Sequence, residues 1–429
     1  MKKHKIILPL LCLLLLSGCG VLSEPADTNT PISPAPIVLG EREYTPDTQH
    51  IQLESPALIE DLIAAGASFD VLRQVTVGGG AVTAGQLSAL REAFPDTAFQ
   101  YTVALPGGEV PSDTEALDLS DLGTHQVSAA ASALELLPEL KTVQLPEELP
   151  LEDYITLKTA APQAQFAYSF ELFGQTVTTE TEALSYSHVE IGNEGAAEFA
   201  RVLPCLDKLQ ELRIEYCGID DETMAQLRDA FPEKNIAWRV IYGWASSWSD
   251  AETIWAIGGF SDQQFESLKY CTKVKYLDIG HNGIYSLEFV KYMPDLEVLI
   301  IENDYVSDLS ALATCRNIEY LEVGETQVTD VSPLAACTSL EHLKIGGLLG
   351  LTDISPLYDL PNLKRLYGLC DVNVPREQVD YIKSIMPNTE IDFDYYPKGA
   401  VNGGRWRYAD DGSLVPRYQL LHDQIGYYW

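Results

Sequence analysis

Basic side chains are scarce in this sequence of 429 residues. Lys and Arg together number 28, whereas Asp and Glu number 63, and the formal net charge is −35. A negative field of this size repels nucleic acid, teichoic acids and anionic lipid head groups. The composition therefore argues against nucleic acid as a partner. It favours an acidic exterior that keeps the protein dispersed, or a neutral or basic partner.

Short motifs of catalytic and metal sites are missing as well. The seven histidines are scattered without an H-E-x-x-H pair, and the sequence holds no G-x-S-x-G elbow, no G-x-x-x-x-G-K-[ST] loop and no C-x-x-C spacing. We therefore expect no enzyme, no metal and no cofactor. Because acid–base pairs assemble through space, the alternative is a cell-envelope enzyme, or an accessory subunit, that acts on polysaccharide.

The first twenty residues predict a signal rather than part of the fold. A basic start precedes an apolar run that is too short to span a membrane comfortably, and the run ends in Leu16-Ser17-Gly18-Cys19. This ending resembles the bacterial lipobox, which implies diacylation of Cys19. An ordinary secretory signal is the alternative. Since two acyl chains anchor firmly, we expect a lipid-anchored protein on the extracytoplasmic face of the cell membrane.

Leucine recurs at a spacing of 22 residues between residues 246 and 368. Aliphatic residues accompany each leucine two places later and three places earlier, which is the L-x-x-L-x-L pattern of a leucine-rich repeat strand. The segments between the strands, such as VTDVSPLAAC, resemble internalin-type leucine-rich repeats of Gram-positive bacteria. No single repeat can bury its own apolar edge, so the stack is the stable unit. The leucine column consists of Leu277, Leu299, Leu321, Leu343 and, after one extra residue, Leu366.

Four prolines outside these repeats share a frame. Apolar residues one, five and eight places before each proline mark a helix face that the proline ends, and alternating apolar residues after it predict a strand. Residues 50–108, 115–174 and 187–243 therefore look like three modules of strand, helix, strand, helix and strand, and residues 375–396 like the end of a fourth. Such modules joined to internalin-like repeats resemble clostridial surface lipoproteins. The prolines are Pro95, Pro162, Pro232 and Pro387.

The predicted fold class is α/β: a leucine-rich repeat solenoid with a parallel concave sheet and a helical or irregular convex side. We expect the C-terminal tail to pack as a cap over the last repeat. The predicted segments are a lipoprotein signal peptide (1–18), a flexible tether rich in Pro, Ser and Thr (19–48), three degenerate long leucine-rich-repeat modules (49–245), internalin-like repeats (246–368), a terminal helix–strand cap (369–396) and an aromatic tail (397–429).

Three cysteines occupy one column of the repeats. Cys271, Cys315 and Cys337 each precede the strand leucine of their repeat by six residues, and Met293 and Leu360 fill the same column elsewhere. The column requires an apolar filler, which a free cysteine provides, so core packing explains the spacing without a ligand role. A disulfide between Cys315 and Cys337 in adjacent repeats is the alternative.

Functional residues are expected on the concave sheet, because the residues beside the inward leucines point outward there. Aromatic, aliphatic and charged side chains held ready on a rigid sheet suit recognition of a protein or glycan partner. The alternatives are a solvated surface, a cover formed by the chain's own C-terminal tail, or a scaffold of the producer's envelope. The candidate ligand-binding residues are Tyr276, Asp278, Ile300, Glu302, Tyr320, Glu322, His342, Lys344, Arg365 and Tyr367.

Overall fold

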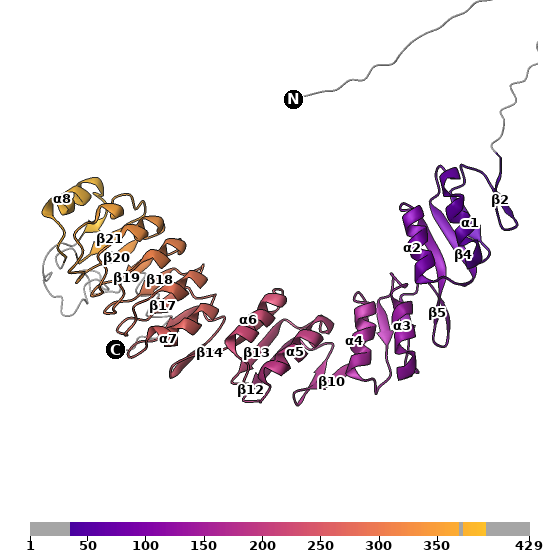
Figure 1. The fold of residues 1–429 in the computed structure, drawn as a ribbon, viewed down its shortest axis with the longest axis horizontal. Coiled ribbons are helices and arrows are strands. Elements are labelled where there is room, and N and C mark those ends of the chain that lie inside the picture. Colours follow the sequence, from indigo (N-terminus) through magenta and orange to yellow (C-terminus); the bar gives the residue numbers. More distant parts are fainter. Residues whose placement is uncertain (1–34, 369–371, 392–429) are drawn as a thin grey trace, which may run out of the picture. The chain divides into compact units, whose positions relative to one another are not determined.

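The structure, a computed structural model, describes residues 35–368 and 372–391 (Figure 1). The chain divides into two compact units. The first comprises the described residues up to Thr114 together with Glu135–Glu139, and the second comprises Glu115–Leu134 together with the described residues from Leu140 onward. Cys19, the signal segment, Cys370 and the aromatic tail lie outside the described residues.

The first unit is built on a four-stranded sheet with the order β3-β4-β5-β6, parallel except for β6. Helix α2 begins at a capping box between Thr83 and Gln86 and buries Leu87 and Leu90 against the sheet. The elements are β3 (His50–Leu53), η1 (Pro56–Leu58), α1 (Ile59–Ala64), η2 (Gly66–Ser68), β4 (Gln74–Ala81), α2 (Ala84–Ala93), β5 (Ala98–Leu105) and β6 (Gly108–Pro111).

Part of the predicted flexible tether is ordered, so the boundary at residue 48 is wrong. Strands β1 (Ile37–Leu39) and β2 (Arg42–Tyr44) form an antiparallel hairpin. Leu39 is buried, and the Tyr44 hydroxyl donates to the carbonyl of Gln52 at 2.8 Å. The hairpin forms because this stretch has apolar residues to bury, whereas the Pro-Ser-Thr bias belongs to the residues before it.

The second unit contains two further modules of strand, helix, strand, helix and strand, which is the order that the proline frame predicts. Their sheets are β7-β8-β9, all parallel, and β12-β13-β14-β15, with β15 antiparallel; β10 and β11 form a separate hairpin. The elements are β7 (Ala116–Asp118), η3 (Thr124–Gln126), α3 (Val127–Leu134), β8 (Thr142–Gln144), α4 (Leu151–Ala160), β9 (Gln165–Ala167), β10 (Ser169–Leu172), β11 (Gln175–Thr178), β12 (Ala183–Ser187), α5 (Gly192–Val202), η4 (Leu203–Cys205), β13 (Glu211–Glu215), α6 (Asp221–Ala230), β14 (Asn235–Tyr242) and β15 (Ala245–Trp248).

Each of the four prolines lies two residues after the last residue of a helix. Helices α2, α4, α6 and α8 (Arg376–Ile385) end one residue before a C-cap whose ψ lies between 64° and 72°, and the proline comes next. A proline disfavours the helical region for the residue before it, so the helix ends where the frame predicts. The C-cap residues are Phe94, Ala161, Phe231 and Met386.

A seven-stranded parallel sheet, β16 to β22 in chain order, forms the rest of the second unit (Figure 1). The leucine column becomes a row of neighbours, since Leu277 pairs with Leu299 and Leu299 with Leu321. The predicted parallel sheet is confirmed. The elements are β16 (Thr253–Trp255), α7 (Asp262–Phe265), η5 (Glu266–Tyr270), β17 (Tyr276–Asp278), η6 (Glu288–Tyr292), β18 (Val298–Ile300), η7 (Ser310–Thr314), β19 (Tyr320–Glu322), η8 (Ser332–Ala336), β20 (His342–Lys344), η9 (Ser355–Leu357), β21 (Arg365–Tyr367) and β22 (Glu390–Ile391).

The turn after each repeat strand holds one residue in the left-handed region of the backbone. His281, Asn303, Glu325 and Gly347 occupy this position at the period of the repeat, with φ between 56° and 79°. Such a conformation is uncommon outside glycine, so four successive repeats share one demanding turn. Because the turns are equivalent, the chain leaves each strand in the same direction, and this keeps the strands in register.

The one extra residue in the spacing of the repeats lies directly after this turn. Glu325 and Gly347 keep the spacing of 22, whereas the buried Val328 and Leu351 are separated by 23 residues. The addition therefore falls between Gly347 and Leu351. There Leu349 projects into solvent with 72% of its surface exposed.

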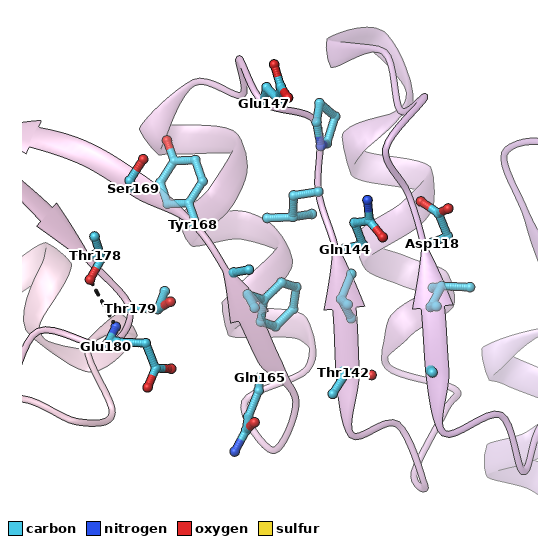
Figure 2. A pocket seen from close by; sticks show the side chains of 17 residues that line it. Asp118, Thr142, Gln144, Glu147, Gln165, Tyr168, Ser169, Thr178, Thr179 and Glu180 are labelled. Atoms are coloured by element: carbon cyan, nitrogen blue, oxygen red, sulfur yellow. Dashed lines mark hydrogen bonds between the residues drawn. The ribbon is translucent and has the colours of Figure 1, made fainter.

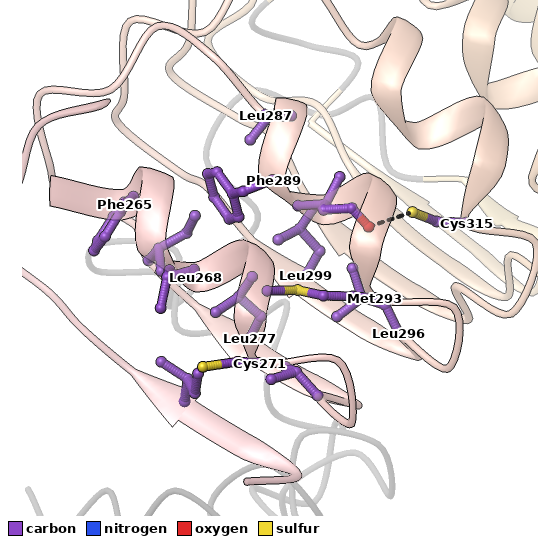
Figure 3. Packing of buried hydrophobic residues seen from close by; sticks show 14 of the residues in the cluster. Phe265, Leu268, Cys271, Leu277, Leu287, Phe289, Met293, Leu296, Leu299 and Cys315 are labelled. Carbon is purple, nitrogen blue, oxygen red and sulfur yellow. Dashed lines mark hydrogen bonds between the residues drawn. The ribbon is translucent and has the colours of Figure 1, made fainter. Parts of the chain in front are cut away.

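The repeat cysteines are buried free thiols in the hydrophobic core. Figure 3 shows Cys271 and Cys315 among the leucines. The Cys315 thiol donates to the carbonyl of Val290 at 3.6 Å, and the Cys337 thiol donates to that of Leu312 at 3.5 Å. Burial raises the pKa of the Cys271 and Cys337 thiols to about 12. Core packing is thus confirmed as their role. The alternative disulfide between Cys315 and Cys337 is wrong, because each thiol points at a carbonyl of the preceding repeat.

Leu321→Asp tests the register, because it places a carboxylate in the fully buried centre of the leucine row. We expect the free energy of unfolding to fall by roughly 3 kcal/mol or more, measured by urea denaturation. Thr329→Asp introduces the same group at an exposed position of the same repeat and serves as the control. Equal urea midpoints for the two variants would show that the register is wrong.

Candidate functional site

Alternation along the repeat strands separates two sets of side chains. The central leucine of each strand points into the core, and the residues on either side of it point to the opposite face, which we call the outer face. The parallel register brings the candidate residues together there in two rows. The rows are Tyr276, Val298, Tyr320, His342 and Arg365, and Asp278, Ile300, Glu322, Lys344 and Tyr367.

The centre of the outer face is buried, so the expectation of exposed side chains is wrong there. Val298, Tyr320 and Glu322 expose none of their surface, and Ile300 exposes 2%. A side chain on an uncovered sheet keeps contact with water, and burial of both faces is the mark of a covered sheet. The residues that keep part of their exposure are Tyr276, His342, Arg365 and Tyr367.

Charged residues of the outer face are paired with one another. Lys344 donates a hydrogen bond to Glu302 and lies 3.8 Å from a carboxylate oxygen of Glu322, while the Tyr320 hydroxyl donates to Glu322. All four residues are buried. Glu302 stands where neighbouring repeats have glycine, and its side chain meets Lys344 two strands away. These charged side chains therefore form an internal ion cluster and are not presented to a partner.

Burial changes the protonation of this cluster and its neighbours. The pKa of Glu302 is raised to about 7, because burial and the nearby Glu322 carboxylate together outweigh the opposing effect of Lys344. Burial also lowers the pKa of His342 to about 4, and the charge of Arg365 adds to that effect. His342 is consequently neutral at pH 7 and offers no cationic contact to an acidic ligand.

A second surface, which we call the loop edge, lies along the turn between β14 and β15 and the loops that follow the repeat strands β17 to β20. Four large apolar side chains are exposed on it: Trp244 (72%), Tyr285 (59%), Tyr305 (49%) and Leu349 (72%). The Trp244 ring stacks on Phe260 with 4.7 Å between centroids, and the Tyr285 and Tyr305 rings stack on each other at 5.1 Å. The stacking orients three aromatic rings that remain open to solvent on one side.

Main-chain hydrogen bonds hold the loop edge together. The N–H groups of Gly283, Tyr305 and Gln327 each donate to a carbonyl of the preceding loop at 2.9 Å. Leu349 and Gln327 line one shallow hollow, which extends the row to the next repeat. The exposed apolar residues therefore lie on a hydrogen-bonded backbone, and little conformational entropy would be lost when a partner covers them.

A cleft of about 1120 Å³ lies over the sheet β7-β8-β9 (Figure 2). Asp118, Thr142, Gln144 and Gln165 project into it from the strands. Hydrogen bonds from Ser120 lower the pKa of Asp118, so this carboxyl group is ionised at neutral pH and does not suit a general acid. The cleft therefore offers polar and carboxylate groups on an open sheet.

The columns of residues that recur at a spacing of 22 do not predict the loop edge. Tyr285 and Tyr305 are 20 residues apart rather than 22, and Trp244 belongs to the turn between β14 and β15, before the repeats begin. The available signal is that large apolar residues stand in segments otherwise rich in Gly, Asn and Asp. Because the turn directs these side chains away from the core, they are not buried there.

The enzyme alternative calls for groups that converge on a substrate. Over residues 35–368 and 372–391, no cluster of three or more His, Cys, Asp and Glu side chains is arranged to hold a metal ion. Burial raises the pKa of Asp304 to about 7, but this carboxyl group is buried and accepts the N–H of Asn282, in the turn of the preceding repeat, at 2.9 Å. In the same described part of the chain, we find no helix with the length and apolar character that a membrane crossing needs.

Lys344→Met removes the cation that lies between two buried carboxyl groups. We expect a loss of about 3 kcal/mol in the free energy of unfolding, partly restored by adding Glu302→Gln, as measured by urea denaturation at pH 7. Lys364→Met breaks an exposed pair with Glu341 and should cost at most about 1 kcal/mol. Equal losses for the two lysine variants, or no rescue by Glu302→Gln, would contradict the ion cluster.

Residues 270–284 match the family model described as "Leucine Rich repeat", whereas no curated protein matches the sequence. Among solved structures, an internalin (inlF) of Listeria monocytogenes is 18% identical, covers 75% of this chain and 73% of its own, and has a TM-score of 0.32. A leucine-rich repeat protein of Leptospira interrogans is 14% identical, with coverages of 77% and 74% and a TM-score of 0.29. A chain of an octameric complex of Latrophilin 3, Unc5D and FLRT2 is 17% identical, with coverages of 73% and 90% and a TM-score of 0.30. The family match and the register of β17–β21 together show that this chain contains leucine-rich repeats.

Proposed function

We propose that this chain is a lipid-anchored leucine-rich repeat protein that recognises a protein partner on the extracytoplasmic side of the cell membrane. The observation that carries the proposal is the loop edge, where Trp244, Tyr285, Tyr305 and Leu349 are each about half exposed or more. Exposed apolar residues that stand singly are ordinary, whereas a row of them on a rigid backbone is typical of an interaction surface. Tyrosine and tryptophan are also the residues that dominate binding energy in such surfaces.

The loop edge replaces the outer face as the proposed site, because a partner needs side chains that it can reach. Val298, Tyr320 and Glu322 on the outer face are fully buried and would have to be uncovered first. A protein partner fits the loop edge better than a glycan, since Leu349 offers apolar surface without a polar group. The proposal also includes two finer points. The repeats form a solenoid, which rests on the repeat pattern, and the protein is of the clostridial lipoprotein type, which rests on the lipobox.

A photoreactive benzophenone side chain at position 285 tests the surface directly. We expect the full-length protein in cells of the producing organism to cross-link to a second polypeptide, because position 285 lies at the centre of the row. The same group at position 292, an exposed tyrosine on the short helix η6, serves as the control. Tyr305→Ala together with Leu349→Ala should lower the cross-linking yield at position 285 by at least about tenfold while leaving thermal unfolding nearly unchanged. Equal cross-linking at positions 285 and 292 would rule out the loop edge.

The lipid anchor has its own test, because Cys19 is the residue on which the lipobox resemblance depends. Cys19→Ser should move the protein from the membrane fraction to the medium or periplasm, since the hydroxyl cannot form the thioether that carries the lipid. Immunoblotting of cell fractions is the measurement, and Cys12→Ser in the preceding apolar run is the control. Retention of the Cys19→Ser protein in the membrane fraction would contradict the anchor and leave the loop edge unaffected.

A further inference from the structure

We propose that Asp304 carries a proton in the folded chain, that its Oδ2–H group donates to the carbonyl of Ile301, and that this bond holds the turn that carries Tyr305. The starting point is a buried oxygen atom without a donor. Asp304 exposes 2% of its surface, and among the described residues its Oδ2 atom has no hydrogen-bond partner. A bare carboxylate oxygen in such a place is costly, because nothing replaces the water that it loses.

The preceding repeat shows how a side chain at this position is bonded. Asn282 stands 22 residues before Asp304, and its Oδ1 atom accepts the N–H of Phe260 at 3.0 Å. Its Nδ2 atom donates to the carbonyl of Ile279, three residues earlier, at 2.7 Å. Asp304 accepts the N–H of Asn282 through Oδ1 at 2.9 Å, which is the same contact one repeat later. The Oδ2 atom of Asp304 therefore takes the place of the amide nitrogen, which is a donor.

The following repeat makes the same bond with a different side chain. Thr326 stands 22 residues after Asp304, and its hydroxyl donates to the carbonyl of Val323, again three residues earlier, at 2.8 Å. The corresponding carbonyl for Asp304 is that of Ile301, which is fully buried. In the described part of the chain, no N–H group donates to this carbonyl. One proton on Oδ2 would satisfy both buried oxygen atoms.

The electrostatic surroundings of Asp304 favour the protonated form. Its pKa is raised to about 7, because burial and the charge of Asp262 outweigh the two backbone N–H groups that the carboxylate accepts. An aspartate in an unfolded chain has a pKa of about 4. The folded chain therefore keeps the proton at pH values at which the unfolded chain has released it. The hydrogen bond is present at low pH and is lost as the pH rises through about 7.

Three further titratable groups lie on the turns beside Asp304. His281, in the preceding turn, bonds through its ring to Asn303 at 3.0 Å. Glu302, in the same turn, accepts a hydrogen bond on the outer face. Glu325, in the following turn, is exposed to solvent. None of these groups donates to Oδ2, so the described residues offer no substitute for the proton.

The consequence for binding rests on the proposed role of the loop edge. Asp304 lies directly before Tyr305, whose ring stacks on that of Tyr285. The N–H of Tyr305 donates to the carbonyl of Ile284 at 2.9 Å, next to the residue that carries the other ring. Loss of the proton sets a carboxylate against the Ile301 carbonyl and loosens this turn. We therefore expect the loop edge to bind its partner more strongly below about pH 7 than above it.

Asp304→Asn tests the proton, because an amide donates at every pH and already occupies the equivalent position at Asn282. The measurement is hydrogen exchange of the backbone amides around Tyr305, followed by mass spectrometry on the full-length protein at about pH 6 and about pH 8. We expect equal exchange rates in the unaltered chain and the variant at the lower pH. At the higher pH, the unaltered chain should exchange at least about fivefold faster. Comparison of the two chains at one pH cancels the intrinsic effect of pH on exchange.

Asp295→Asn removes an exposed carboxylate shortly before β18 and serves as the control. It should exchange like the unaltered chain at both pH values, because its side chain lies in solvent. A ratio of exchange rates between the unaltered chain and Asp304→Asn that is the same at both pH values would overturn the proposal.

The cross-linking assay at position 285 tests the consequence for the loop edge. In cell envelopes of the producing organism, we expect the yield from the chain that keeps Asp304 to fall by about tenfold between about pH 6 and about pH 8, whereas the Asp304→Asn chain keeps its yield. An equal dependence on pH in both chains would overturn the regulatory role. If neither chain cross-links at either pH, the loop edge itself is contradicted, and the exchange rates still decide whether Asp304 carries the proton.

Discussion

Each repeat strand is only three residues long, and its leucine is buried only when the strands on both sides are in register. Every other feature of the second unit depends on this mutual burial. The left-handed turn recurs because each strand must leave the sheet in the same direction. The cysteine column recurs because each repeat leaves the same space behind its leucine, and the thiols fill it without forming a bond. A substitution that disrupts the packing of one repeat therefore also affects the packing of the repeats next to it.

Much of this arrangement was predictable from the sequence, because periodic patterns report what a side chain does relative to its own backbone. The leucine column gave the parallel register, and the four prolines gave the ends of helices α2, α4, α6 and α8. Tyr320 and Ile300 were predicted to point away from the core, and they do. Their burial was not predictable, since a period of two along a strand shows which face a side chain lies on and not whether that face is covered.

The loop edge escaped prediction for a different reason. Tyr285 and Tyr305 leave the period of 22, because the turns need only their backbone geometry to repeat and not their side chains. The period of 22 therefore identifies the residues that pack in the core. It does not identify residues at positions that the fold leaves unconstrained. Tyr285 and Tyr305 occupy such unconstrained positions, and we place recognition there.

The extra residue between Gly347 and Leu351 shows how such a chain can vary in length. The left-handed turn at Gly347 comes before the addition and the buried Leu351 comes after it, and both keep their places. The addition is absorbed in the loop, where it pushes Leu349 into solvent. Insertions at this point leave the core untouched and alter only what the protein shows to its surroundings. A stack of this kind can consequently acquire new surface chemistry one residue at a time, without passing through an unstable intermediate sequence.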